Sequence, residues 1–143
     1  NPEDISFSAT PHESEILQNK IKTSTSIVRI LIIEDEDASY KYFEMLLEAK
    51  DYRIERASNC IEAIEKIQKE IFDALLIDIR HDSDSLAAIK EIRKHNPKLP
   101  IIAQTTYTTQ DEFSKAIQAG CNGFVSKPLE KEKLIGIIRK HLR

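Results

Sequence analysis

The side chains with the clearest chemical potential are acids and polar groups that directly follow short apolar runs. Glu34 and Asp35 follow one such run, and Asp78 ends another that is apolar almost throughout. Thr105 and Lys127 follow two later apolar runs, each after one intervening polar residue. An apolar run without alternation is typical of a strand buried on both faces, and open α/β sheets bind ligands at the carboxyl ends of such strands. Asp78 is therefore the first candidate for a reactive group.

These residue types together suit phosphoryl transfer. If the sheet brings Glu34, Asp35 and Asp78 within a few ångströms, two carboxylates about 4 Å apart repel by roughly 4 kcal/mol at an effective dielectric near 20. A bound cation relieves that repulsion, and hard oxygen ligands favour Mg²⁺, which also binds phosphate oxygens. Lys127 adds positive charge and Thr105 adds a hydroxyl. Because phosphoryl transfer needs mainly positioning and charge neutralisation, we expect Asp78 to accept a phosphoryl group.

The elements that must position these residues alternate between strand and helix five times. Apolar runs predict strands, and apolar residues spaced three or four apart predict helices. The predicted strands are 28–33, 53–57, 73–78, 99–104 and 123–125, each followed by a predicted helix. Such alternation implies an α/β fold with a parallel sheet and helices on both faces. The five polar residues then gather at one edge of that sheet.

Capping residues set the expected helix ends. Asn59 and Thr109 are predicted N-caps, and Gly120 suits the position just after a helix. The first helix is expected to run from Ala38 to Lys50, and Pro128 is expected to start the last one.

Composition separates the chain into two parts and excludes several classes. Residues 1–27 are rich in Ser, Thr, Asn and Pro and predict a largely irregular leader or linker, whereas residues 28–143 predict one domain. A net charge of −3 argues against a basic nucleic-acid surface. Cys60 and Cys121 fit neither a CxxC pair nor a disulfide framework. No apolar run approaches the length that spans a bilayer, so we expect a cytoplasmic domain whose membrane anchor, if the parent has one, lies elsewhere.

At this point the motifs resemble a known family, the receiver domains of two-component response regulators. The resemblance covers Val28 to Leu142. It is carried by the ordered segments Ile33-Glu34-Asp35, Leu76-Ile77-Asp78-Ile79, Pro100 to Thr105, Gly120-Cys121 and Ser126-Lys127-Pro128. It implies a flavodoxin-like, doubly wound sheet of five parallel strands in the order 2-1-3-4-5.

The resemblance also implies a role for each polar residue. Asp78 would be the phospho-acceptor and Asp35 a direct Mg²⁺ ligand, with Glu34 acting through water. Arg80 would offer its backbone carbonyl to the metal. The domain would then catalyse its own phosphorylation and dephosphorylation without being a turnover enzyme.

The resemblance implies further roles for residues near the ends of the last two strands. Thr105 and Lys127 would contact the phosphoryl oxygens, and Thr105 with Phe124 would form a conformational switch. The peptide bond between Lys127 and Pro128 matches one that is cis in the family.

The resemblance implies partners as well. The phosphoryl donor would be a histidine kinase or a histidine phosphotransfer domain, with no direct contact to nucleic acid or membrane. The helix after Thr109, the strand at Phe124 and the last helix would form the surface that changes partners, or that pairs with a second copy. A leader before the domain and no effector after it suggest the C-terminal receiver of a hybrid histidine kinase.

Three alternative functions compete with this interpretation, and the residues support them to different degrees. The segment from Arg80 to Ser85 lacks the Met-Pro and Asp-Gly of typical receivers, which motivates a pseudo-receiver that docks without being phosphorylated. Thr106 is larger than the residue usual at its position, so we expect it to slow the access of a phosphodonor or of water to Asp78. An aspartyl-phosphate hydrolase usually has a second Asp two residues after the nucleophile, where this chain has Arg80. A nucleotide-binding Rossmann domain is disfavoured, because the chain has only three glycines and no glycine-rich loop.

Overall fold

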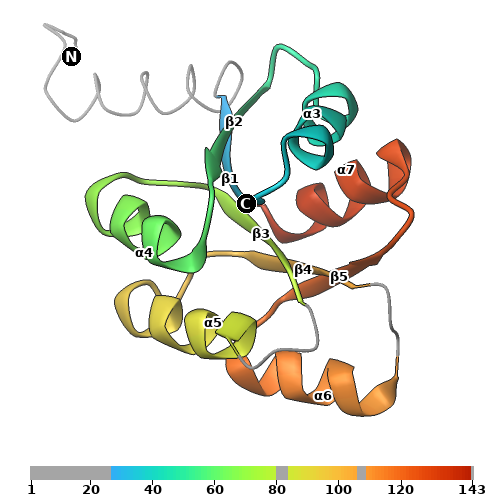
Figure 1. Cartoon of the computed structure of the whole chain (residues 1–143). Coiled ribbons are helices and arrows are strands. Elements are labelled where there is room, and N and C mark those ends of the chain that lie inside the picture. Colours follow the sequence, from blue (N-terminus) through green and yellow to red (C-terminus); the bar gives the residue numbers. More distant parts are fainter. Residues whose placement is uncertain (1–26, 80–83, 106–108, 143) are drawn as a thin grey trace, which may run out of the picture.

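The computed structural model describes residues 27–79, 84–105 and 109–142. Strands and helices alternate along the chain (Figure 1). The elements are β1 (Val28–Ile33), α3 (Asp37–Leu46), β2 (Tyr52–Ala57), α4 (Cys60–Lys69), β3 (Ala74–Asp78), α5 (Asp84–His95), β4 (Ile101–Thr105), α6 (Gln110–Ala119), β5 (Gly123–Ser126) and α7 (Lys131–His141). Within these ranges no helix combines the length and the apolar character that a bilayer crossing demands.

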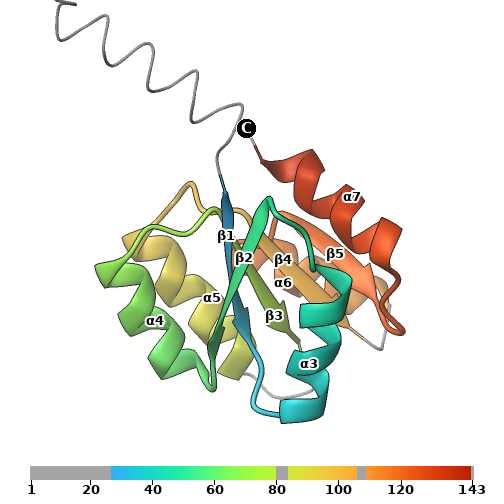
Figure 2. The same cartoon turned by 90° about the horizontal axis from the view of Figure 1, so that it is seen from above.

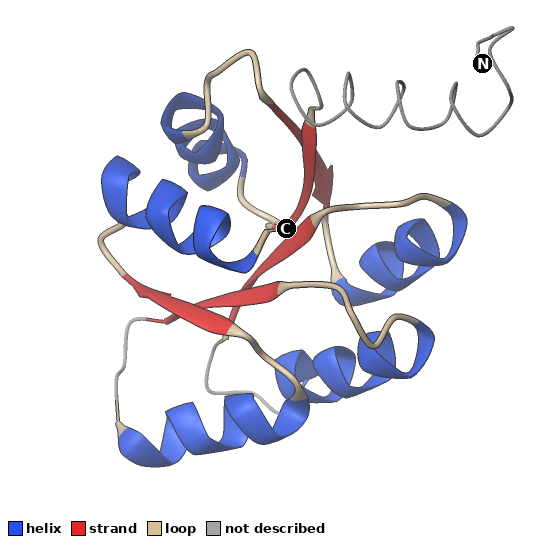
Figure 3. Ribbon diagram, turned by 180° about the vertical axis from the view of Figure 1, so that it is seen from behind, coloured by secondary structure: helices blue, strands red, loops and turns tan. Residues whose placement is uncertain are grey.

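The five strands form one parallel sheet in the order β2-β1-β3-β4-β5. The α/β fold and the strand order expected from the sequence are therefore confirmed. Helices α3 and α7 cover one face of the sheet, and α4, α5 and α6 cover the other (Figures 2 and 3). This double covering explains why the central strands are apolar on both faces.

Strand β3 lies in the middle of the sheet and carries Asp78 at its carboxyl end. Its first four residues are buried, with Leu75 and Ile77 facing the α4–α6 side and Leu76 facing the α3–α7 side. Burial of a large apolar side chain stabilises the fold by about 1.5–3 kcal/mol. The reactive candidate is thus attached to a well-packed, central strand of the sheet.

The predicted helix caps are confirmed where the structure describes them. The Asn59 side chain accepts a hydrogen bond from the Glu62 amide at 2.8 Å, and Thr109 accepts one from the Glu112 amide at 3.2 Å. Gly120 follows α6 with φ of +129°, a conformation that favours glycine.

Two predicted helix boundaries were wrong. Helix α3 ends at Leu46 rather than Lys50, because the chain turns there and the Tyr52 amide bonds to the Ala49 carbonyl at 3.2 Å. Helix α7 begins at Lys131 rather than Pro128. Leu129 is buried against α3, where its carbonyl accepts a hydrogen bond from the Tyr42 hydroxyl at 2.7 Å.

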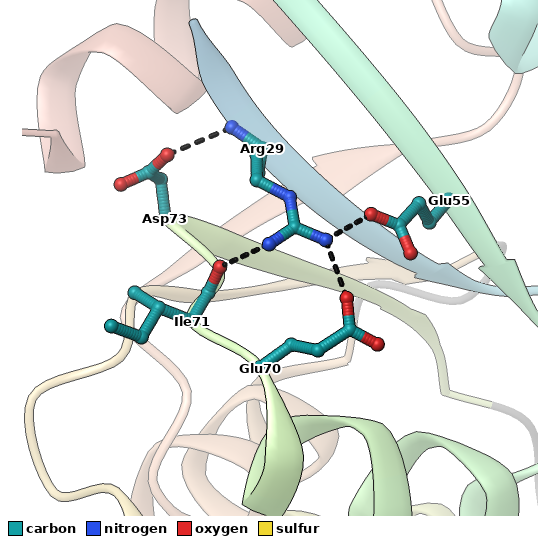
Figure 4. A network of polar contacts seen from close by, with 5 residues as sticks. All are labelled: Arg29, Glu55, Glu70, Ile71 and Asp73. Atoms are coloured by element: carbon teal, nitrogen blue, oxygen red, sulfur yellow. Dashed lines mark hydrogen bonds and ion pairs between the residues drawn. The ribbon is translucent and has the colours of Figure 1, made fainter. Parts of the chain in front are cut away.

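A polar network fastens the other end of β1, away from the strand ends that carry the candidate site (Figure 4). The Arg29 guanidinium bonds to Glu55, to Glu70 at 2.7 Å and to the Ile71 carbonyl at 3.1 Å, while its amide donates to Asp73 at 2.8 Å. The hydrogen bond from Arg29 lowers the pKa of the Glu70 carboxyl. The network ties β1 to β2 and to the segment that enters β3.

Candidate functional site

The parallel register brings the predicted site residues to one edge of the sheet. Asp78 pairs with Gln104, and Thr105 pairs with Ser126, the residue before Lys127. On the other side of β3, Ile33 of β1 pairs with Ile77, so Glu34 follows at the level of Asp78. Residues that lie far apart along the chain therefore surround the carboxyl end of β3.

Asp78 and Lys127 are in direct contact. The Lys127 ammonium donates a hydrogen bond to the Asp78 carboxylate at 2.6 Å. The Asp78 side chain is only 9% exposed, whereas that of Lys127 is 38% exposed. Since Lys127 is the more exposed partner, its charge is accessible to an anion that approaches this carboxylate.

Thr105 and Lys127 are also linked through the backbone. Thr105 is buried at the end of β4, and its carbonyl accepts a hydrogen bond from the Lys127 amide at 3.1 Å. Thr105 ends β4 and pairs with Ser126, the last residue of β5, so the Thr105 hydroxyl and the Lys127 ammonium are carried by neighbouring strand ends. The structure places both of them where the sequence predicted.

The loop after β1 carries the other two acids. Glu34 is buried, its amide bonds to the Ala57 carbonyl at 2.9 Å, and its carboxylate accepts the Glu36 amide at 3.2 Å. Asp35 is exposed. The loop therefore holds one acid inside the protein and offers the next one to solvent.

The carboxylates do not form the compact cluster that the sequence predicted. Across the described ranges, no three His, Cys, Asp or Glu side chains lie in a group that could hold a metal ion. Asp78 turns toward Lys127 and Glu34 toward its own loop, which lowers the repulsion between the acids. Mg²⁺ needs only one or two carboxylates and keeps several waters, so these hard oxygen donors still suit it.

Phe124 packs beside this edge on β5. Its ring meets the ring of Phe113 on α6 in an edge-to-face arrangement, with centroids 4.8 Å apart and planes at 79°. Phe124 is half-buried and packs on the α4–α6 side of the core. Because Phe113 belongs to α6, a movement of the Phe124 ring would change the packing of α6 on the sheet.

Two predictions fall on residues that the structure leaves undescribed. Arg80, expected to offer a carbonyl to the metal, and Thr106, expected to affect access to Asp78, lie outside the described ranges.

Two residues near the site were missed by the sequence interpretation. Ser85, buried in the first turn of α5, donates its hydroxyl to the Asp78 carbonyl at 3.2 Å. Arg56 contacts the loop after β1, with its Nε 2.7 Å from the Glu34 carbonyl oxygen. No motif marks Ser85. Arg56 lies within the polar strand β2, after Glu55, so the rule that selected polar residues at the ends of apolar runs does not single it out.

Comparison with known proteins agrees with this geometry. Residues 30–139 match the family model described as the response regulator receiver domain. The chain belongs to this family. The prediction of a receiver domain from the strand-end motifs is thereby confirmed.

Relatives of this receiver domain occur in different kinds of protein. It is 33% identical over 108 residues to the transcriptional regulatory protein ZraR of Klebsiella oxytoca, covering 75% of this chain and 24% of that protein. It is 32% identical over 133 residues to hybrid signal transduction histidine kinase G of Dictyostelium discoideum, covering 89% of this chain and 4% of that protein. The chain thus matches less than a quarter of the length of either relative.

Its fold is also that of solved receiver domains. The receiver domain of the sensor histidine kinase PA1611 from Pseudomonas aeruginosa, solved with a magnesium ion in its active-site cleft, superposes with a TM-score of 0.71. The two are 29% identical, and the match covers 80% of this chain and 96% of that one.

Proposed function

We propose that this receiver domain accepts a phosphoryl group on Asp78 from a phosphohistidine and thereby changes its binding partners. The observation that carries the proposal is the Asp78 carboxylate itself. It ends the central strand, its side chain is 9% exposed, and the Lys127 ammonium lies 2.6 Å away. In a receiver domain, that combination of a sheltered carboxylate and a neighbouring cation suits an aspartyl nucleophile.

The transfer step needs little from the protein beyond positioning. An Asp78 carboxylate oxygen forms a bond to phosphorus while the phosphorus–nitrogen bond of the phosphohistidine breaks. The bonding electron pair stays on the imidazole nitrogen of the donor. Lys127 and the Thr105 hydroxyl then offer hydrogen bonds to the phosphoryl oxygens, and Lys127 exchanges its contact with the free carboxylate for one with the new dianion.

Asp35, Asp78 and Glu34, the last through water, would hold Mg²⁺ together with the Arg80 carbonyl. When bound, the ion supplies neutralisation of the negative charge shared by the carboxylates and the phosphoryl group. The exposed Asp35 and the sheltered Asp78 provide hard oxygen donors from two neighbouring strand ends.

The proposed output passes through Thr105 and Phe124. A phosphoryl group held by Thr105 favours one arrangement of the β4 end, and the Phe124 ring, packed on Phe113, transmits that preference to α6. The face built by α6, β5 and α7 then changes its affinity for a partner or for a second copy. We propose residues 28–143 as the receiver domain, preceded by a leader at 1–27, within a cytoplasmic part of a hybrid histidine kinase.

Phosphorylation can be tested with a small phosphodonor. The wild-type chain is incubated with acetyl phosphate with and without Mg²⁺, and the phosphorylated fraction is read by intact mass spectrometry. The same assay is run on Asp78→Asn and on Asp111→Asn, a control that removes an exposed acid of α6. We expect Mg²⁺-dependent labelling of the wild type and of Asp111→Asn, and none of Asp78→Asn.

Labelling that persists in Asp78→Asn would refute the assigned acceptor. Absence of labelling in the wild type, with the chain folded by circular dichroism, would refute the phosphorylation switch and favour a docking module.

A further inference from the structure

Arg56 is the residue that joins β2 to the loop carrying the proposed metal ligands. It lies near the end of β2, on the face covered by α3. Its Nε donates to the Glu34 carbonyl at 2.7 Å, and a terminal nitrogen of the same guanidinium donates to the Asp37 carboxylate at 2.7 Å. The guanidinium also lies over the Tyr40 ring, 5.4 Å from its centroid.

These contacts enclose the segment between β1 and α3. Glu34 is the first residue after β1, and Asp37 is the first residue of α3. The N-cap residue, Glu36, makes no side-chain cap to the helix, so this helix start lacks that brace, although the Glu36 amide donates to the Glu34 carboxylate in the same loop. The planar guanidinium supplies a brace from the neighbouring strand instead.

The brace acts on geometry more than on stability. Asp37 is 87% exposed, and an ion pair to so exposed a partner contributes little to folding. The carbonyl contact is different, because it fixes the peptide that joins Glu34 to Asp35. A metal site tolerates ligand displacements of only about 0.5 Å.

We propose that Arg56 is a positioning residue, which holds the Glu34–Asp35 peptide in the geometry that binds the divalent cation. This inference rests on the proposed function, since it concerns the same site. It assigns Arg56 no contact with the metal or with the phosphoryl group.

Charge and geometry make opposite predictions for this residue. Arg56 carries a positive charge near an acidic loop, so by charge alone its removal should tighten cation binding. If its main role is to hold the loop, its removal should weaken cation binding. The lysine variant separates the two, because lysine keeps the charge but lacks the rigid fork that reaches both acceptors and lies over an aromatic ring.

The test measures metal affinity directly. Mn²⁺ is titrated into the wild type, Arg56→Lys and Arg56→Met with detection by electron paramagnetic resonance, and Mg²⁺ is used as competitor. Arg53→Lys is the control, because Arg53 is exposed on the same strand and alternation turns it to the opposite face. We expect both Arg56 variants to raise the dissociation constant, by about tenfold. Arg53→Lys should leave it unchanged.

A second readout does not depend on the metal. Hydrogen exchange of the Asp35 and Glu36 amides, followed by nuclear magnetic resonance on the metal-free protein, should be faster in Arg56→Lys than in the wild type. Exchange of the β3 amides should stay the same.

The outcomes separate this inference from the proposed function. Unchanged or tighter Mn²⁺ binding in the Arg56 variants would overturn the positioning role, and so would an equal loss in Arg53→Lys. Absence of Mn²⁺ and Mg²⁺ binding by the wild type would instead refute the metal site, and the exchange experiment would then decide on the brace alone.

Discussion

Replacing Gly120 with alanine should destabilise the fold strongly, for two reasons visible in the structure. Gly120 has φ of +129°, and a Cβ placed there would lie 2.5 Å from Cγ of Arg93 and 3.0 Å from its Nε. Arg93 cannot easily move aside, because it donates hydrogen bonds to the carbonyls of Gly120 at 2.9 Å and Asn96 at 3.1 Å.

The expected size follows from these two effects. A residue with a Cβ in a left-handed conformation costs about 1–2 kcal/mol. Displacing Arg93 removes a hydrogen bond from a charged group, worth about 1.5–3 kcal/mol. Because partial relaxation will recover some of this energy, we expect Gly120→Ala to lower the free energy of unfolding by about 3 kcal/mol.

Gly136 is a matched control in the same chain. It lies within α7, and a Cβ built there meets nothing within 4 Å. Since glycine weakens a helix interior, Gly136→Ala should stabilise the fold by about 0.5–1 kcal/mol.

Urea unfolding followed by circular dichroism at the helix band measures both variants, which suits a chain without tryptophan. A loss below about 1 kcal/mol in Gly120→Ala would contradict the argument from φ and close contact. A loss of similar size in Gly136→Ala would show that added methyl groups are harmful in general.

Three further predictions concern local interactions. Asn59→Ala should cost about 1 kcal/mol in urea unfolding through loss of the α4 cap, whereas Asn59→Asp should be nearly neutral. Burial raises the pKa of the Cys121 thiol to about 12, which leaves little thiolate at neutral pH, so Ellman's reagent should modify the half-exposed Cys60 first. The hydrogen bond from Arg29 lowers the pKa of the Glu70 carboxyl from its usual 4.5. The ion pair therefore stabilises the folded state at pH values above 4.5, and this stabilisation is lost as the pH falls through the lowered pKa. In Glu70→Gln, the urea concentration at the unfolding midpoint should therefore fall less steeply with decreasing pH in the acid range than in the wild type. An unchanged pH dependence would contradict this assignment.

The sequence predicted the sheet well because its strands are unambiguous. Buried runs such as Ala74–Ile77 have only one stable environment, between two layers of helices, and the alternation with helices leaves only a parallel sheet. Asp78 and Lys127 meet because parallel strands end at the same edge, so their contact follows from the topology.

The details that the sequence missed depend on long side chains and on local packing. Pro128 looked like a helix start, but the burial of Leu129 against α3 delays α7 to Lys131. The reach of Arg56 from β2 to the Glu34 carbonyl is set by rotamers rather than by any spacing. The contacts that Asp78 makes with Lys127 and that Glu34 makes with the Glu36 amide likewise depend on side-chain conformation, which the positions of the acids at strand ends do not reveal.

The proposed phosphorylation switch requires Asp78 to carry the phosphoryl group, and chemical trapping tests this directly. The chain is treated with acetyl phosphate and Mg²⁺, and borohydride is added to reduce an acyl phosphate to an alcohol, which converts a phosphorylated aspartate to homoserine. Peptide mass spectrometry should then find homoserine at position 78 and aspartate at position 35. Homoserine at position 35, or phosphate that survives borohydride on another side chain, would contradict the account.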